Sequence, residues 1–130
     1  MDKPPRISDS EWRVMRVLWS KGAATANEVV DELASETHWN PRTVKTLITR
    51  LMKKGAVKYS KEGRMYRYYP AVDEADCVHM ERRSFVQRVY GGISTPMIAA
   101  FIQDAKLSTD EIEQLRHILD QKDKEQRCNP

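Results

Sequence analysis

The sequence has few of the residues that mark several protein classes. Only two of its 130 residues are cysteines, Cys77 and Cys128, and neither belongs to a closely spaced pair. This excludes a disulfide-stapled scaffold and predicts reduced thiols in a cytoplasmic protein. No apolar run approaches the ~20 residues that a membrane span needs, so membrane insertion is not expected. Residues 1–6 lead into no apolar segment, which argues against a secretory signal.

Acidic residues are scarce in one segment. Residues 40–67 contain nine Lys or Arg and a single acid, Glu62. Residues 1–70 carry a net charge of +6 and residues 71–130 a net charge of −3. This asymmetry predicts that the first half binds a polyanion. Charge by itself does not separate nucleic acid from an anionic membrane.

Residues 40–55 read as a basic amphipathic helix with both ends marked. Asn40 suits the cap position, Pro41 the first helical position, and Gly55 the stop. Apolar residues recur on one side, whereas the opposite side carries cations and threonines without an acid. Such a face suits the DNA major groove, where Arg reads guanine, Thr contacts thymine methyls and Lys neutralises phosphate. A basic surface helix without a partner is the alternative.

This helix and the hairpin that follows it supply the candidate DNA contacts. The predicted base contacts lie in the first turns of the helix: Arg42, Thr43 and Thr46. The predicted phosphate contacts are Asn40, Lys45, Thr49, Arg50, Lys53, Lys61 and Arg64.

The segments around this helix complete a predicted winged helix-turn-helix domain. The spacings Ser8 to Glu11 and Thr25 to Glu28 are those of capping boxes and predict helices at about 9–20 and 26–35. Three helices joined by short turns form a helix-turn-helix skeleton. Two β-prone runs, 56–60 and 65–70, flank a turn at 61–64 and predict a hairpin. We expect most of its tyrosines to pack on the helices and its tip to reach the DNA backbone or minor groove.

The second half is predicted to be helical and to dimerise. Helices are expected at 74–90, with Asp73 as cap, at 95–103, and from 109 onward, with a frayed tail at 120–130. Their apolar stripes are too sparse to form a separate core, so packing against a second chain is favoured. The alternative is a monomer whose last helices fold back on the first domain. The candidate dimer contacts are Phe85, Val89, Met97, Phe101, Ile112, Leu115, Ile118 and Leu119.

The predicted fold is therefore mainly α with a small β-hairpin wing. Residues 1–70 form the DNA-binding domain and residues 71–130 the dimerisation region. No nucleophile–base pair is evident, and capping explains the carboxylates at helix starts, so an enzyme is not predicted. Cys77 with His79, or His117 with Cys128, lacks a third ligand at a supporting spacing, so neither a metal nor another cofactor is predicted.

Several motifs together resemble a known family. They comprise residues 7–15, beginning Ile7-Ser8-Asp9-Ser10-Glu11-Trp12, residues 39–46, residues 51–57, and the hairpin with its terminal Tyr69-Pro70. The chain resembles the penicillinase and methicillin-resistance repressors and the related copper-responsive repressors (BlaI/MecI/CopY type) over nearly its whole length.

The resemblance implies a homodimeric repressor that binds a two-fold operator and controls antibiotic resistance. In some members a membrane sensor metalloprotease, triggered by β-lactam, leads to repressor cleavage at an Asn-Phe bond in the dimerisation region. The matching bond here is Ala100-Phe101, with Ala in place of Asn. The copper branch binds metal through a C-terminal pair of CxC motifs, whereas this chain has only Cys128 near its end.

Two other functions are compatible with parts of this pattern. The first is a metal-responsive repressor of the same fold, released by metal binding rather than by cleavage. The second is a protein-interaction module whose winged helix no longer binds DNA. That module would carry acids on the outer face of residues 41–53, and none is present.

Overall fold

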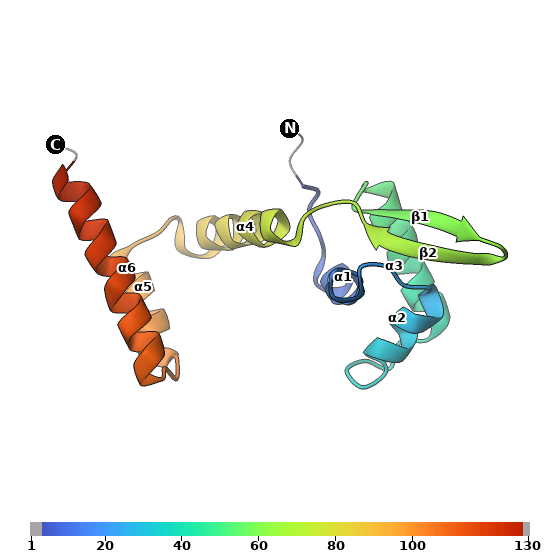
Figure 1. Ribbon diagram of the computed structural model, residues 1–130, viewed down its shortest axis with the longest axis horizontal. Coiled ribbons are helices and arrows are strands. Elements are labelled where there is room, and N and C mark those ends of the chain that lie inside the picture. The colour runs from blue at the N-terminus through green and yellow to red at the C-terminus, as the bar shows by residue number, and fades with distance from the viewer. Residues whose placement is uncertain (1–3, 129–130) are drawn as a thin grey trace. The chain divides into compact units, whose positions relative to one another are not determined.

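The computed structural model describes residues 4–128, which divide into two compact units with the boundary between Val89 and Tyr90. The first unit contains helices α1 (Asp9–Lys21), α2 (Ala26–Leu33) and α3 (Pro41–Lys53), strands β1 (Val57–Glu62) and β2 (Met65–Pro70), and helix α4 (Glu74–Phe85) (Figure 1). A π-helical segment, η1 (Val86–Tyr90), follows α4. The second unit contains α5 (Thr95–Asp104) and α6 (Thr109–Cys128). The predicted fold class, mainly α with a hairpin wing, is confirmed.

The first two helices start at the predicted capping boxes. In α1 the Glu11 amide donates to Ser8 Oγ, and the Ser8 amide donates to Glu11 Oε1 at 2.8 Å. Thr25 and Glu28 make the same reciprocal pair at the start of α2. The second helix ends at Leu33, two residues earlier than predicted.

Helix α3 is held at both ends. Asn40 Oδ1 accepts the Thr43 amide at 2.9 Å, and Pro41 occupies the first turn. At the other end the Gly55 amide donates to Met52 O and the Ala56 amide to Leu51 O, which is a Schellman motif. Gly55 has φ 81°, a conformation that side chains with a Cβ seldom adopt.

The hairpin has a two-residue loop instead of the predicted four-residue turn. Glu62 pairs with Met65, so Gly63 and Arg64 form the loop and Lys61 lies in β1 opposite Tyr66. Gly63 has φ 63°, as the first loop position of a type II′ turn requires. The prediction that Lys61 belongs to the turn was therefore wrong.

One core joins these elements. Apolar residues of the three helices and of the segment entering β1 are fully or almost fully buried: Val14, Met15, Leu18, Val29, Val44, Ile48, Leu51, Ala56 and Val57. Tyr68 and Ala24 exchange two backbone hydrogen bonds, so the turn between α1 and α2 extends the hairpin sheet. Trp19 Nε1 donates to Val72 O at 3.0 Å. The buried side chains Val44, Ile48 and Leu51 fix the position of α3 on this core.

Helix α4 belongs structurally to the first unit. Cys77 on α4 is buried in the core of that unit, which extends to Val89. The Asp73 side chain makes no capping hydrogen bond, contrary to prediction. The helical segment reaches Tyr90 as predicted, but its last five residues adopt the π conformation.

The second unit buries little apolar surface. Helix α6 continues to Cys128, so the predicted fraying from residue 120 was wrong, and the pair Arg127–Asp123 at 3.1 Å supports its last turns. Among the described residues of this unit, Met97 is the buried hydrophobic residue. The side chains of Ile93, Ile118 and Leu119 are more than half exposed.

Candidate nucleic-acid interface

One face of α3 gathers most of the predicted DNA contacts. A hollow of about 510 Å³ is lined entirely by residues of this helix, which are Arg42, Lys45, Thr46, Thr49, Arg50 and Lys53. The opposite face buries Val44, Leu47, Ile48 and Leu51 in the core. The helical period thus separates an apolar side that anchors the helix from a cationic side that faces solvent.

The cations of this face are available for an external anion. Within residues 4–128, Arg42, Lys45, Arg50 and Lys53 make no ion pair. No acidic residue lies on α3 itself. Because no carboxylate neutralises these side chains, their positive field extends into solvent and suits a phosphate backbone.

The threonines of the face have defined hydroxyl orientations. Thr46 Oγ1 donates to Arg42 O, and Thr49 Oγ1 donates to Lys45 O, both at 2.9 Å. With its proton held by the helix, each hydroxyl can only accept a hydrogen bond from a ligand, and each side chain also offers its methyl group. Such groups match donor edges and thymine methyls in the major groove.

Two predicted contacts lie at the start of the helix. The Asn40 Oδ1 atom is engaged in capping, so only its amide nitrogen can donate to a phosphate. Thr43 is half-buried, unlike the exposed Arg42 and Thr46.

The hairpin presents two exposed cations beside its loop. Arg64 occupies the loop, and the ammonium of Lys61 lies 5.8 Å from the centroid of the Tyr66 ring. Arg67, in contrast, pairs with Glu62 at 3.3 Å and approaches Glu28 at 3.9 Å. Lys61 and Arg64 therefore keep their charges available for a phosphate, as does the exposed Lys58 of β1.

A positioning contact for α3 escaped the sequence reasoning. Lys54, just after the helix, donates to Arg6 O at 2.9 Å and to Glu11 Oε1 at 2.5 Å. The capping box identified Glu11, but no local pattern links it to a lysine 43 residues away. Burial acts to raise the pKa of the Glu11 carboxyl, but the hydrogen bonds from Lys54 and Ser8 outweigh it and hold the pKa below its ordinary value.

The candidate pairs of metal ligands gain no third ligand within the described residues. Across residues 4–128 no three His, Cys, Asp or Glu side chains gather in a metal-binding arrangement. Burial raises the pKa of the Cys77 thiol, and Asp76 and Asp73 raise it further, whereas Cys128 is exposed on α6. None of the helices within the same range combines the length and hydropathy of a membrane span.

Known proteins match this chain over most of its length. The family model described as Penicillinase repressor matches residues 7–121. The chain is 40% identical to the penicillinase repressor of Bacillus licheniformis over 121 residues, covering 93% of this chain and 94% of the relative. It is 39% identical to the methicillin resistance regulatory protein MecI of Staphylococcus aureus strain N315, covering 93% and 98% of the two chains.

A solved structure matches in fold as well as in sequence. The solution structure of monomeric Bacillus licheniformis BlaI in complex with the blaP half-operator superposes with a TM-score of 0.51 at 46% identity. The match covers 58% of this chain and 93% of that chain.

Proposed function

The chain belongs to the penicillinase repressor family, and we propose that it is a homodimeric repressor that binds a two-fold operator through α3 and the hairpin wing. The observation that carries this proposal is the unpaired cationic face of α3. The similar BlaI domain is in complex with a half-operator, which supports double-stranded DNA as the ligand. The proposed site of action is the cytoplasm.

The proposed division of DNA contacts follows the geometry of α3. Arg42, Thr43 and Thr46 lie in its first two turns and would read base edges. The phosphate contacts would come from Asn40, Lys45, Thr49, Arg50 and Lys53, with Lys61 and Arg64 reaching the backbone beside the occupied groove. Phosphate contacts position the protein, whereas base contacts select the sequence.

The exposed apolar residues of the C-terminal helices support dimerisation. Seven of the eight proposed contacts are exposed or half-buried: Phe85, Val89, Phe101, Ile112, Leu115, Ile118 and Leu119. The eighth, Met97, is buried within the protomer, so it would support the interface from beneath. A second copy of the chain would cover these exposed apolar side chains and remove them from water.

Induction by proteolysis is proposed at the Ala100-Phe101 bond. Both residues are exposed and lie within α5, so cleavage requires local unwinding of that helix. A cut there separates α6 from the DNA-binding unit. The two DNA-binding units of the dimer would then no longer be linked. Each would lose the gain in effective concentration that comes from binding two half-sites together. A membrane sensor metalloprotease is the proposed partner that triggers the cleavage.

The test is binding to a two-fold family-type operator and to random duplex across a salt series, with the protein mass in solution determined alongside. We expect a dimer, a large specific-to-random affinity ratio and a steep salt dependence. Equal affinity for both duplexes would refute sequence-specific binding. A monomer on the operator would refute the proposed dimer.

A further inference from the structure

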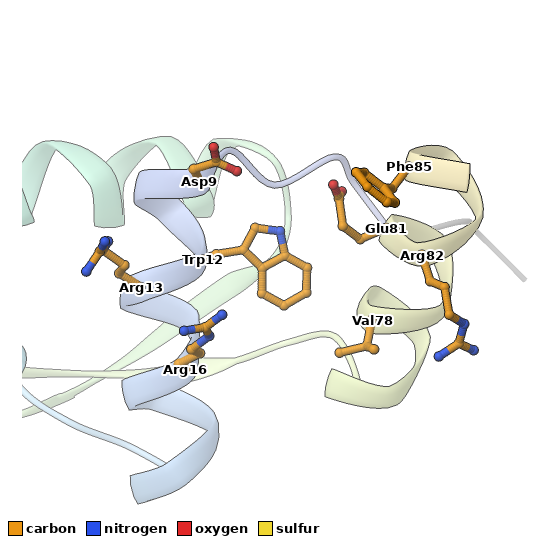
Figure 2. Close-up of a pocket in the computed structure, with 8 residues that line it drawn as sticks. All are labelled: Asp9, Trp12, Arg13, Arg16, Val78, Glu81, Arg82 and Phe85. Atoms are coloured by element: carbon orange, nitrogen blue, oxygen red, sulfur yellow. The ribbon is translucent and has the colours of Figure 1, made fainter. Parts of the chain in front are cut away.

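A hollow of about 650 Å³ lies between α1 and α4, on residues that the proposed DNA contacts do not use. Figure 2 shows the Trp12 indole extending from α1 toward α4, with Val78, Glu81 and Phe85 on the facing helix. The remaining lining residues are Asp9, Arg13, Arg16 and Arg82. The hollow lies within the first unit, and its size suits a small organic molecule.

The central surface of this hollow is aromatic and contains an unsatisfied donor. The Trp12 Nε1 atom is shielded from solvent and has no acceptor among residues 4–128. In Figure 2 this nitrogen lies on the edge of the indole nearest Glu81. A buried N–H without a partner carries a free-energy cost, which a ligand oxygen beside it would relieve.

The charged side chains of the hollow differ in their availability. Arg13 pairs with Glu36 at 3.2 Å, Glu81 pairs with Arg88 at 3.5 Å, and Arg82 contacts His79 Nδ1 at 3.0 Å. Arg16 makes no ion pair or hydrogen bond to another side chain within the described part of the chain, and neither does Asp9. The hollow therefore offers one uncommitted guanidinium and one uncommitted carboxylate.

These two groups lie at opposite ends of the Trp12 side chain. In Figure 2, Asp9 lies toward the start of α1 together with Glu81, and Arg16 lies further along the helix, level with Val78. A ligand spanning the hollow would thus meet a cation at one end. At the other end it would meet carboxylates and the indole N–H.

We propose that this hollow binds a small planar aromatic carboxylate that carries a hydroxyl group at its far end. The carboxylate would accept a bidentate pair of hydrogen bonds from Arg16. The aromatic ring would pack on Trp12 and Val78. The hydroxyl proton would go to Asp9 or Glu81, and the hydroxyl oxygen would accept from Trp12 Nε1 once a small rotation of the indole exposes that shielded atom to the hollow. A ligand with a second negative charge at that end would be repelled by the same carboxylates.

The first experiment titrates the full chain with 6-hydroxy-2-naphthoate by isothermal titration calorimetry. Two comparison ligands separate the contacts: 2-naphthoate lacks the hydroxyl, and 2-naphthol lacks the carboxylate. We expect one site per chain, with binding weakened about tenfold for each missing group, equivalent to about 1.4 kcal/mol. No binding of 6-hydroxy-2-naphthoate at about 1 mM would overturn the proposal.

Variants locate the site on the chain. Arg16→Gln is expected to weaken 6-hydroxy-2-naphthoate about tenfold and to leave 2-naphthol unchanged, because only the former carries a carboxylate. Arg83→Gln removes the same charge from an exposed position of α4 outside the hollow, and should leave all three affinities unchanged. Trp12→Phe keeps an aromatic ring but removes the indole N–H. It should weaken the binding of 6-hydroxy-2-naphthoate more than the binding of 2-naphthoate, which has no hydroxyl.

The paired variants also show whether the ligand occupies this hollow. If Arg16→Gln and Arg83→Gln behave alike, the ligand binds elsewhere, for example on the exposed apolar surface of the C-terminal helices. The measurement involves no DNA, so its failure would leave the proposed repressor function intact. A failure of operator binding would equally leave this site untouched.

Discussion

Lys54 and Glu11 form an ion pair that ties the end of α3 to the start of α1. Lys54 Nζ lies 2.5 Å from Glu11 Oε1, and the Glu11 side chain is 1% exposed. Lys53, the preceding residue, is exposed and makes no ion pair within residues 4–128. Two adjacent lysines are therefore expected to serve different purposes, one inside the fold and one toward DNA.

The first prediction concerns stability. We expect Lys54→Met to lower the free energy of unfolding by about 1–3 kcal/mol, because it leaves the buried Glu11 carboxylate without its cation. Lys53→Met should change it by less than about 0.5 kcal/mol, as is usual for an exposed side chain. Urea unfolding of both variants measures the difference. Similar losses in the two variants would contradict a structural role for Lys54.

The second prediction concerns acid. Burial tends to raise the pKa of Glu11, but the hydrogen bonds from Lys54 and Ser8 lower it below the ordinary value. Its stabilisation is therefore fully present above the unfolded pKa, about 4.3, and is lost as the pH falls through the lower folded pKa.

Unfolding curves collected between pH 6 and pH 3 test this dependence. Glu11→Gln cannot titrate, so its stability should fall less over that range than the stability of the unaltered chain. Hydrogen bonds from Thr25 and Ser108 also lower the pKa values of Glu28 and Glu111. These two residues contribute the same pH dependence of stability to the variant and to the unaltered chain. Parallel curves would show that Glu11 is not responsible.

The third prediction separates base reading from phosphate contact. Arg42→Ala should cost about 1–3 kcal/mol on the operator and relax preference at one base position. Lys53→Ala should weaken operator and random duplex alike and reduce the slope of log affinity against log salt by about one. Titrations of both duplexes over a salt series provide the measurement. Equal losses on both duplexes for both variants would disprove the proposed division.

The fourth prediction concerns the dimer. Leu119 is 62% exposed on α6, so Leu119→Glu should leave the protomer folded but place a charge in the proposed interface. We expect the dimer dissociation constant to rise at least about tenfold, or 1.4 kcal/mol. Gln121→Glu adds the same charge roughly on the opposite side of the helix and serves as the control. Sedimentation equilibrium measures both, and unchanged association of Leu119→Glu would exclude this face.

The fifth prediction concerns the proposed cleavage. A chain truncated after Ala100 should bind the full operator about 10²–10⁴-fold more weakly, because its DNA-binding units are no longer linked in a dimer. Its affinity for a half-operator should remain, since α1 to α4 and the hairpin are intact. If the truncated chain bound the full operator as tightly as the complete chain, induction by cleavage at this bond would be ruled out.

The sequence alone determined the local elements and the cationic character of the outer face of α3. The caps Ser8, Thr25 and Asn40 each bond a partner three residues away, so the starts of α1, α2 and α3 are encoded locally. The helical period likewise assigns Arg42 and Val44 to different faces without tertiary information. The family resemblance could be recognised for the same reason, because its motifs are short contiguous segments.

The tertiary structure decided the relationships that span the chain. The Lys54–Glu11 pair, the Ala24–Tyr68 bridge and the burial of Cys77 join residues far apart in sequence, which no local pattern specifies. The hollow around Trp12 is lined by residues of α1 and α4 together, which lie far apart in the sequence. Caps and helical faces depend on neighbouring residues, whereas ion pairs, cores and cavities depend on how the whole chain packs.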